Sequence, residues 1–150
     1  MSDYRVIEVK QSVLASNEQK ADELRSKMKE KGTLLINLMS SPGSGKTTTL
    51  RRTIKALKGK LDIAVMEADI DSDVDAAAIS EVGAQTIQLH TGGMCHLDVA
   101  MCAQGLEGLA AGDADVIFLE NVGNLVCPAE FDTGAGVNVT ILSVPEGDDK

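Results

Sequence analysis

The sequence contains no tryptophan and only three aromatic side chains, Tyr4, Phe118 and Phe131, so a folded core must be built from aliphatic residues. Its three cysteines, an odd number, argue against a disulfide scaffold. Only 14 lysine and arginine residues stand against 23 aspartate and glutamate residues, and the net charge of −9 argues against a nucleic-acid partner. No apolar run reaches the length of a membrane span, about 18 residues. Because residues 1–10 also lack a secretory signal, we expect a cytoplasmic protein.

The 150 residues are enough for one domain with a substantial core. An amphipathic helix is predicted over 16–31, so we divide the chain into an N-terminal helical extension, 1–32, and a main domain, 33–150. Strands and helices then alternate, which is typical of an α/β fold with a mostly parallel sheet and helices on both faces. The predicted strands cover 33–39, 62–67, 85–89, 115–120 and 138–144, and the predicted helices cover 46–58, 73–82 and 96–111.

Residues 40–47, with the sequence SSPGSGKT, follow an apolar run and precede a predicted helix. A strand, a glycine-rich loop and a helix in this order are typical of a P-loop NTPase. Glycines let the backbone N–H groups wrap a phosphate chain, Lys46 would reach the β- and γ-phosphates, and Thr47 would hold Mg²⁺. Ser40 stands where the strict GxxxxGK(S/T) pattern has its first glycine, and an ordinary glycine-rich turn is the alternative.

Acidic residues crowd the segment 68–75, directly after a predicted strand. A carboxylate there can hold Mg²⁺ or its waters beside the phosphates. Asp69 is the first candidate for this role and Asp75 the second. Helix capping by Asp71 or Asp73 is the alternative interpretation of the same residues.

Residues 115–120 form an apolar stretch that ends in Glu120, the layout of a Walker B strand with Glu in place of the commoner Asp. Gly123 follows shortly after and could sense a γ-phosphate through its backbone N–H, as switch segments do. Apolar strands that end in an acid are common, so the pattern gains weight only from the phosphate-binding loop upstream. Ligands of parallel sheets bind at the carboxyl ends of the strands, so we expect these loops to gather at one edge.

Cys95 and His96 lie where a loop leads into the predicted helix 96–111, and Cys127 follows the Walker B strand. A helix N-terminus favours the thiolate that binds metals, and two thiols with an imidazole suit Zn²⁺ or Ni²⁺. Adjacent ligands such as Cys95 and His96 cannot easily hold one ion within one chain, but they can serve a site shared across a two-fold dimer. Alternatively, the cysteines are buried apolar residues, an interpretation that fits Cys102 best. We expect His90 to be incidental.

Three segments resemble the HypB family, the nickel-insertion GTPases of nickel–iron hydrogenase maturation. They are NLMSSPGSGKTTTL at 37–50, TGGMCHLD at 91–98 and ENVGNLVCPAEFDTG at 120–134. Serine at position 40 is usual in this family. Related GTPases of urease maturation share the phosphate-binding loop but lack the ENVGNLVCP segment.

The resemblance implies a GTP-dependent homodimer that handles nickel, often together with zinc, at its interface. It implies metal ligation by Cys95, His96 and Cys127. It assigns the nucleotide roles to residues of the sheet edge: phosphate contact to Gly43, Ser44, Gly45, Lys46, Thr47 and Thr48, and Mg²⁺ or switch roles to Asp69, Asp75 and Glu120. Lys46, Asp69 and Glu120 are the catalytic candidates. The expected partners are a small zinc-containing nickel chaperone and a hydrogenase large-subunit precursor.

Members of this family also carry an Asn-Lys-x-Asp motif that reads the guanine base, in a part that follows the region of resemblance. No such motif occurs in these 150 residues. We therefore expect the phosphate and Mg²⁺ contacts to be present and base discrimination to be weak. A parallel sheet without its last strand should also expose an unpaired edge. The alternative function is a dimer that binds Ni²⁺ or Zn²⁺ and does not hydrolyse nucleotide.

Overall fold

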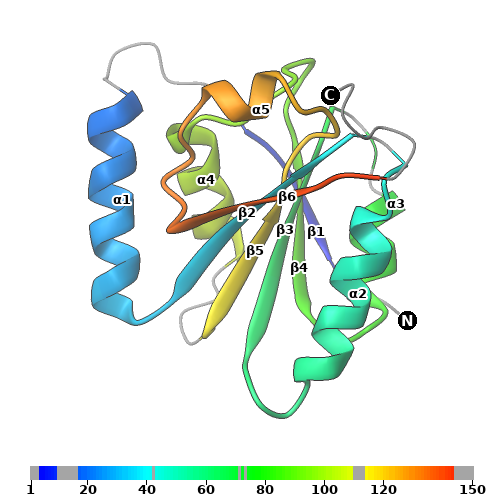
Figure 1. The fold of residues 1–150 in the computed structure, drawn as a ribbon. Helices are drawn as coiled ribbons and strands as arrows, with labels where there is room; N and C mark the ends of the chain where they lie inside the picture. The colour runs from blue at the N-terminus through cyan, green and yellow to red at the C-terminus, as the bar shows by residue number, and fades with distance from the viewer. Residues whose placement is uncertain are drawn as a thin grey trace.

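The computed structural model describes residues 4–9, 17–41, 43–70, 72, 74–109 and 114–143. They form a six-stranded sheet flanked by helices (Figure 1). The strands are β1 (Arg5–Glu8), β2 (Leu34–Ser40), β3 (Ile63–Asp69), β4 (Gln85–His90), β5 (Val116–Glu120) and β6 (Val137–Ile141). The helices are α1 (Asn17–Lys31), α2 (Lys46–Leu57), α3 (Val74–Ser80), α4 (Val99–Leu109) and α5 (Cys127–Glu130). None of the described helices is long and apolar enough to cross a bilayer.

Every strand pair of the sheet is parallel, in the order β1-β4-β3-β5-β2-β6. Helices α1 and α4 cover one face and α2 and α3 cover the other (Figure 1). Met66 of β3 joins the core cluster that includes α4, whereas its neighbour Val65 joins the cluster that includes α2 and α3. Successive side chains of a strand point to opposite faces, so one apolar strand serves both layers. The predicted α/β fold with a mostly parallel sheet is confirmed.

The core on both faces of the sheet is aliphatic, as the composition predicts. Leu35, Leu89 and Ile117 are among its fully buried members, and the buried members of both clusters are aliphatic apart from the methionines and Cys102 of the cluster next to α4. Phe118 is only partly buried, against the cluster under α2 and α3. Dense packing of branched and unbranched aliphatic side chains therefore takes the place of aromatic anchors.

Predicted and observed elements differ at several points. The sequence pattern does not predict β1 or α5, which have only four residues each. α4 begins at Val99 and not at residue 96, because the Asp98 carboxylate accepts the Met101 N–H at 2.9 Å and caps the helix. Cys95 and His96 therefore lie in the preceding loop, which corrects their expected place at a helix N-terminus. The predicted limits at residues 16, 73, 110–111 and 144 lie outside the described residues.

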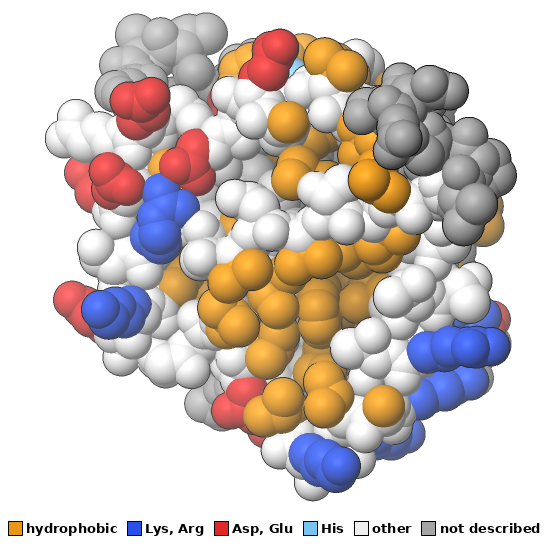
Figure 2. All heavy atoms as spheres, viewed as in Figure 1, with side chains coloured by type: hydrophobic (Ala, Val, Ile, Leu, Met, Phe, Trp, Pro, Cys, Tyr) orange, Lys and Arg blue, Asp and Glu red, His pale blue; other side chains and the backbone are white. Residues whose placement is uncertain are grey.

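β6 forms one edge of the sheet, and no strand of the described part pairs with its outer side. Val137 and Val139 of β6 are 42% and 39% exposed, and Leu34 at the start of β2 is 41% exposed. Figure 2 shows the molecule from the same side as Figure 1, and apolar side chains gather in the middle of the view, where Figure 1 places β6. The sheet thus has an open edge, and the effect of that edge on stability and association stays a prediction.

α1 packs against α4 and against the segment 132–136 that leads into β6. Gly134 in that segment has a φ of +88°, and a Cβ atom there would lie 2.7 Å from Cδ2 of Leu24 in α1. Only glycine permits both this backbone conformation and this close approach. The division into an extension, 1–32, and a main domain, 33–150, stays a prediction, although α1 is in close contact with the rest of the fold.

We predict that Gly134→Ala destabilises the protein more than Gly59→Ala. Both glycines have a positive φ, +88° and +83°, so each alanine strains the backbone by about 1–2 kcal/mol. The Cβ at position 59 meets nothing within 4 Å, whereas the Cβ at position 134 meets Leu24 and adds an overpacking cost of about 1–3 kcal/mol. Urea unfolding of both variants measures the difference. Equal losses would mean that α1 is not tightly packed on this segment.

Candidate functional site

Loops that follow β2, β3 and β5 enclose a cavity of about 540 Å³ at the carboxyl edge of the sheet. Its lining residues are Ser41, Gly43, Gly45, Lys46, Thr47, Thr48, Ala68, Asp69, Ile70, Asp75, Val122 and Gly123. The strand order therefore brings the glycine-rich loop, both aspartate candidates and Gly123 to one place.

The glycine-rich loop has the backbone of an anion-binding turn. Gly43 and Gly45 adopt a left-handed conformation, with φ of +77° and +90°, which glycine takes at little steric cost. α2 begins at Lys46 directly afterwards, and its first turn contains no acidic residue. Unpaired N–H groups at such a helix N-terminus attract phosphate. The Ser44 hydroxyl is buried and has no hydrogen-bond partner in the described structure, so it is one more donor for a bound anion.

Glu120, at the end of β5, holds the two functional side chains of this loop. Its Oε1 accepts a hydrogen bond from the Thr47 hydroxyl at 2.9 Å and lies 3.5 Å from the Lys46 Nζ. Lys46 also donates to the backbone oxygen of Asn121 at 2.9 Å. The end of the Walker B strand is thus in direct contact with the start of α2. A bound phosphate would compete with these contacts for the Lys46 ammonium group.

Three carboxylates lie together beneath the loop. Oxygens of Glu67, Asp75 and Glu120 are all within 4.8 Å of one another. Asp69 lines the same cavity, and its Oδ1 accepts the Ser72 N–H at 3.2 Å, but it does not belong to this group. Of the two aspartate candidates for Mg²⁺, the second choice, Asp75, is therefore the one beside Glu120. Burial raises the pKa of Asp75, as does the Glu120 charge, while the Thr47 hydroxyl opposes the rise.

Glu67 is the member of this group that sequence patterns do not single out. It lies within β3 and is 2% exposed. Burial raises its pKa well above the usual range, and hydrogen bonding to Glu120 and the charges of Glu120 and Asp75 add to the effect, whereas Lys46 opposes it. A neutral Glu67 can share its proton with Glu120, so the pair need not hold two adjacent negative charges.

The donor atoms of this group fit a hard divalent cation. Thr47 offers a hydroxyl, and the Glu120 Oε2 is buried without a partner in the described structure, so it is an unused acceptor. Mg²⁺ takes oxygen ligands of this kind together with phosphate oxygens. The residues around the cavity thus suit a nucleotide phosphate with its magnesium ion.

The loops that carry Cys95 and Cys127 lie side by side. Asn124 joins their loops: its Nδ2 donates to the Cys95 carbonyl oxygen and its Oδ1 accepts the Cys127 N–H, each at 2.8 Å. Hydrogen bonding between the two thiols raises the pKa of Cys127, followed by smaller effects of desolvation and of the Cys95 and Glu130 charges. Both thiols are partly exposed, so a thiophilic metal ion can reach them.

His96 lies near these cysteines but is occupied by an aromatic contact. Its ring stacks on Phe131 with ring centroids 3.7 Å apart and an angle of 8° between the planes. Both ring nitrogens are buried without a partner in the described structure. The ligand atoms of Cys95, His96 and Cys127 do not form a group within 4.8 Å of one another. The three candidate ligands therefore do not converge on one point in the described structure, although Cys95 and Cys127 form a thiol pair.

Cys102 is buried, as the sequence suggests, and His90 lies beside an acidic side chain. Cys102 lies inside α4 with no exposed surface, and burial, followed by the Asp98 charge, raises its pKa to about 12. His90 ends β4, and its Nδ1 lies 3.4 Å from Oε1 of Glu8. Neither Cys102 nor His90 is part of the Cys95–Cys127 pair.

The pattern of the family described as "CobW/HypB/UreG, nucleotide-binding domain" matches residues 34–141. The chain belongs to this family. The hydrogenase maturation factor HypB of Rhizobium leguminosarum bv. viciae is 49% identical over 150 residues, which are 100% of this chain and 50% of that protein. HypB of Escherichia coli (strain K12) is 46% identical over 100% of this chain and 52% of its own length. The chain thus spans about half the length of these curated relatives.

Two solved structures share the fold of this CobW/HypB/UreG domain. The crystal structure of HypB from Helicobacter pylori in complex with nickel has a TM-score of 0.82 and 38% identity, over 91% of this chain and 64% of that one. HypB from Archaeoglobus fulgidus has a TM-score of 0.80 and 38% identity, over 91% and 66% of the two chains. These likenesses confirm the predicted P-loop NTPase fold.

In this member of the family, two asparagines that sequence reasoning overlooks connect the cavity to the cysteines. Asn121 donates through Nδ2 to Oδ1 of Asn37 in β2 at 2.9 Å. The backbone of Asn124 forms an isolated antiparallel β-bridge with Ser40, the last residue of β2 before the glycine-rich loop. Since Gly123 lines the cavity, the segment 121–127 contacts both sites. The sequence signal is Asn121 directly after Glu120 and Asn124 three residues later.

We predict that Glu67→Gln changes how stability depends on pH. The pKa of Glu67 is raised in the folded state, so its contribution to stability is fully present below the unfolded value of about 4.3 and is lost as the pH rises through the folded pKa. Glutamine does not titrate. The free energy of unfolding of the variant, relative to that of the parent, should therefore rise between pH 5 and pH 8. Urea unfolding at both pH values tests this, with Glu107→Gln at an exposed position of α4 as the control. A stability difference from the parent that is the same at both pH values would contradict the expectation.

Proposed function

We propose that the chain is the nucleotide- and metal-binding part of a GTP-hydrolysing metallochaperone that delivers nickel during nickel–iron hydrogenase maturation. The observation that carries this proposal is the short connection between the cavity at the glycine-rich loop and the paired thiols, through Gly123, Asn124 and Cys127. Membership of the CobW/HypB/UreG family and likeness to proteins named hydrogenase maturation factors support it.

Phosphates would lie against the backbone from Gly43 to Thr48 and against Lys46. Magnesium, when bound with the nucleotide, neutralises charge on the phosphates. Thr47 would hold it, and Asp75, Glu120 and Asp69 would hold the ion or its waters. Lys46 must first exchange the Asn121 carbonyl for a phosphate oxygen. The residues then act by position and charge, since phosphoryl transfer depends mainly on these.

Nickel is the cargo in this proposal and would bind at Cys95 and Cys127. Deprotonation of the thiols would accompany binding, because metals bind the thiolate. Two thiols per chain leave a tetrahedral or square-planar ion incomplete, which supports a site shared between two chains of a homodimer. His96 would become a ligand only after it leaves Phe131. Zn²⁺ suits the same ligand types.

Gly123 would sense the γ-phosphate, and Asn124 would pass the change to both cysteine loops. We place this cycle in the cytoplasm, with a small zinc-containing nickel chaperone and a hydrogenase large-subunit precursor as partners. The net charge of −9 argues against nucleic acid as a partner, and no membrane partner is part of the proposal. The segment 121–127 is the element whose two positions would distinguish the loaded and released states.

The second candidate function is a Ni²⁺- or Zn²⁺-binding dimerisation module that does not hydrolyse nucleotide. The thiol pair favours it, because a metal site made of Cys95 and Cys127 needs no nucleotide. The two functions share the metal site and differ in nucleotide recognition. Preference for GTP over ATP is therefore the property that separates them.

We predict that Lys46→Ala weakens binding of a non-hydrolysable GTP analogue with Mg²⁺ at least about tenfold, and the parent's affinity for this analogue relative to the ATP analogue separates the two functions. The lysine would lose charge-assisted contacts to phosphate, and tenfold corresponds to about 1.4 kcal/mol. Titration calorimetry measures both effects, with Lys55→Ala at an exposed position of α2 as the control. Equal or absent binding of the two analogues by the parent would favour the second function. Parent-like binding by Lys46→Ala would refute the phosphate assignment.

We predict that Cys95→Ala and Cys127→Ala each weaken nickel binding at least about tenfold, because each removes a thiolate ligand. Cys102→Ser is the matched control: its side chain is fully buried in α4 and should not affect the site. Ultraviolet absorption from nickel–thiolate charge transfer reports binding and ligand type together. Undiminished absorption in both alanine variants would show that nickel binds elsewhere, and a large loss with Cys102→Ser would identify an overlooked ligand.

A further inference from the structure

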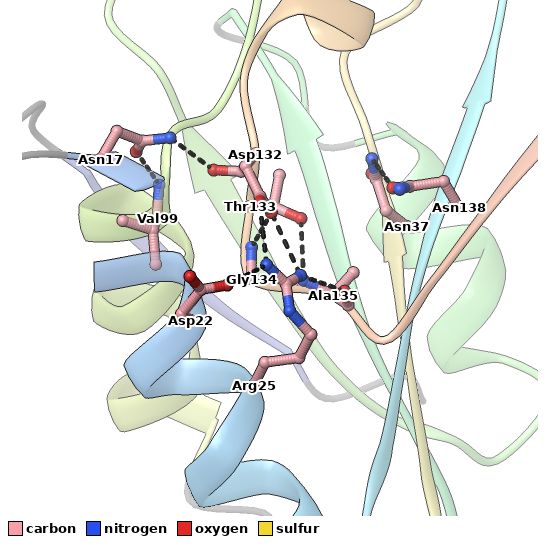
Figure 3. A network of polar contacts seen from close by, with 10 residues as sticks. All are labelled: Asn17, Asp22, Arg25, Asn37, Val99, Asp132, Thr133, Gly134, Ala135 and Asn138. Atoms are coloured by element: carbon pink, nitrogen blue, oxygen red, sulfur yellow. Dashed lines mark hydrogen bonds and ion pairs between the residues drawn. The ribbon is translucent and has the colours of Figure 1, made fainter. Parts of the chain in front are cut away.

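The N-terminal helix reaches both loops that bear the paired cysteines. Asn17, the first residue of α1, accepts the Val99 N–H through Oδ1 and donates through Nδ2 to the Asp132 carbonyl oxygen, each at 2.9 Å (Figure 3). Val99 begins α4, just after the loop of Cys95, and Asp132 follows α5, which begins at Cys127. One side chain therefore joins the two segments by hydrogen bonds to their backbones.

Arg25, two turns further along α1, holds the second of these segments in a fixed orientation. Its Nη1 lies 3.3 Å and its Nη2 2.8 Å from the two carboxylate oxygens of Asp132, and Nη1 donates to the Ala135 carbonyl oxygen at 2.6 Å (Figure 3). Oδ1 of Asp132 also accepts the Gly134 N–H at 2.9 Å. Such a two-point contact between a guanidinium and a carboxylate, here called the fork, fixes the direction of the Asp132 side chain as well as its distance from Arg25. The Arg25 guanidinium, with smaller help from the Gly134 N–H, lowers the pKa of Asp132.

These polar contacts determine geometry more than stability. The side chains of Arg25 and Asp132 are 35% and 38% exposed, and ion pairs with this exposure stabilise a fold only weakly. Leu24 already supplies apolar contact between α1 and Gly134. The hydrogen bonds of Asn17 and Arg25 add directional restraints on backbone groups next to the cysteine loops.

We propose that Asn17, Arg25 and Asp132 form a clamp, here named the α1 clamp, that sets the spacing of Cys95 and Cys127. Asn124 connects the two loops beside the thiols, and the α1 clamp connects them again at their far ends. Two connections leave the loops little freedom to separate. The three clamp residues are positioning residues, and the consequence for nickel rests on the proposed function.

The first test measures the spacing of the thiols without metal. A bifunctional thiol reagent that fluoresces only after joining two neighbouring thiols is added to the reduced protein in a Cys102→Ser background. We expect rapid joining of Cys95 to Cys127 within one chain, as shown by monomer mass on a denaturing gel. Asn17→Ala should slow the joining several-fold, because it loses both backbone contacts. Lys27→Ala, at an exposed position of α1, should behave like the parent.

Two further variants separate loss of the clamp from loss of folding. Asn17→Asp keeps an acceptor for the Val99 N–H and loses the donor to Asp132, so its rate should be intermediate. Arg25→Lys keeps the charge but not the fork, and should also slow the joining. Circular dichroism confirms that each variant is folded. Parent-like rates in folded Asn17→Ala and Arg25→Lys would overturn the proposal, as would a parent that forms no link within one chain.

Nickel titration of the same variants separates this inference from the proposed function. A nickel-binding parent should lose roughly tenfold affinity on Asn17→Ala, as happens when a contact that orients a metal ligand is removed, while affinity for the GTP analogue stays unchanged. A parent that binds no nickel but whose thiol joining depends on Asn17 would refute the function and retain the clamp. Undiminished nickel affinity and parent-like joining in Asn17→Ala would refute the clamp alone.

Discussion

The carboxylate of Glu120 is 1% exposed, and the arrangement of the cavity depends on its partners. A buried charge is tolerated only when opposite charge and hydrogen bonds compensate its lost hydration. Lys46 and Thr47 provide this compensation from the first turn of α2. They can do so only because β5 lies directly beside β2 in the sheet. The contact therefore ties strand order, the glycine-rich loop and the segment after β5 into one unit.

The charge balance around Glu120 also explains why this unit can respond to a ligand. The Lys46 ammonium group lies beside Glu120, close to Asp75 and to Glu67, whose pKa is raised chiefly by burial. A phosphate would draw the lysine away, and a divalent cation would replace its positive charge. Asn121 would then lose the Lys46 contact at its carbonyl oxygen while it keeps its bond to Asn37. Under the proposed function, the backbone after β5 would therefore be the part whose hydrogen bonds change when a phosphate binds.

Local chemistry decides which of these features the sequence predicts. The turn at Gly43 and Gly45 and the helix that starts at Lys46 depend on adjacent residues, so their pattern is sufficient. The buried position of Glu67 becomes meaningful only because β5 pairs with β3 and brings Glu120 beside it. The stacking of His96 likewise depends on Phe131, far along the chain and at the end of a helix too short to predict. Alternating strands and helices are recognised from periodicity, whereas cross-strand charge pairs require the strand order.

The size of any coupling between the nucleotide and the thiols is limited by the contacts that connect them. Allosteric coupling typically amounts to about 1–3 kcal/mol, and a hydrogen bond contributes about 0.5–1.5 kcal/mol net. The contacts at stake are those of Lys46 with the Asn121 carbonyl and of Asn124 with the Cys95 carbonyl and the Cys127 N–H. Breaking two or three of these hydrogen bonds would supply a coupling energy of this size, without movement of the sheet. Because α1 restrains the outer ends of both loops through Asn17, such a change would alter the separation or orientation of the thiols and leave the rest of each loop in place.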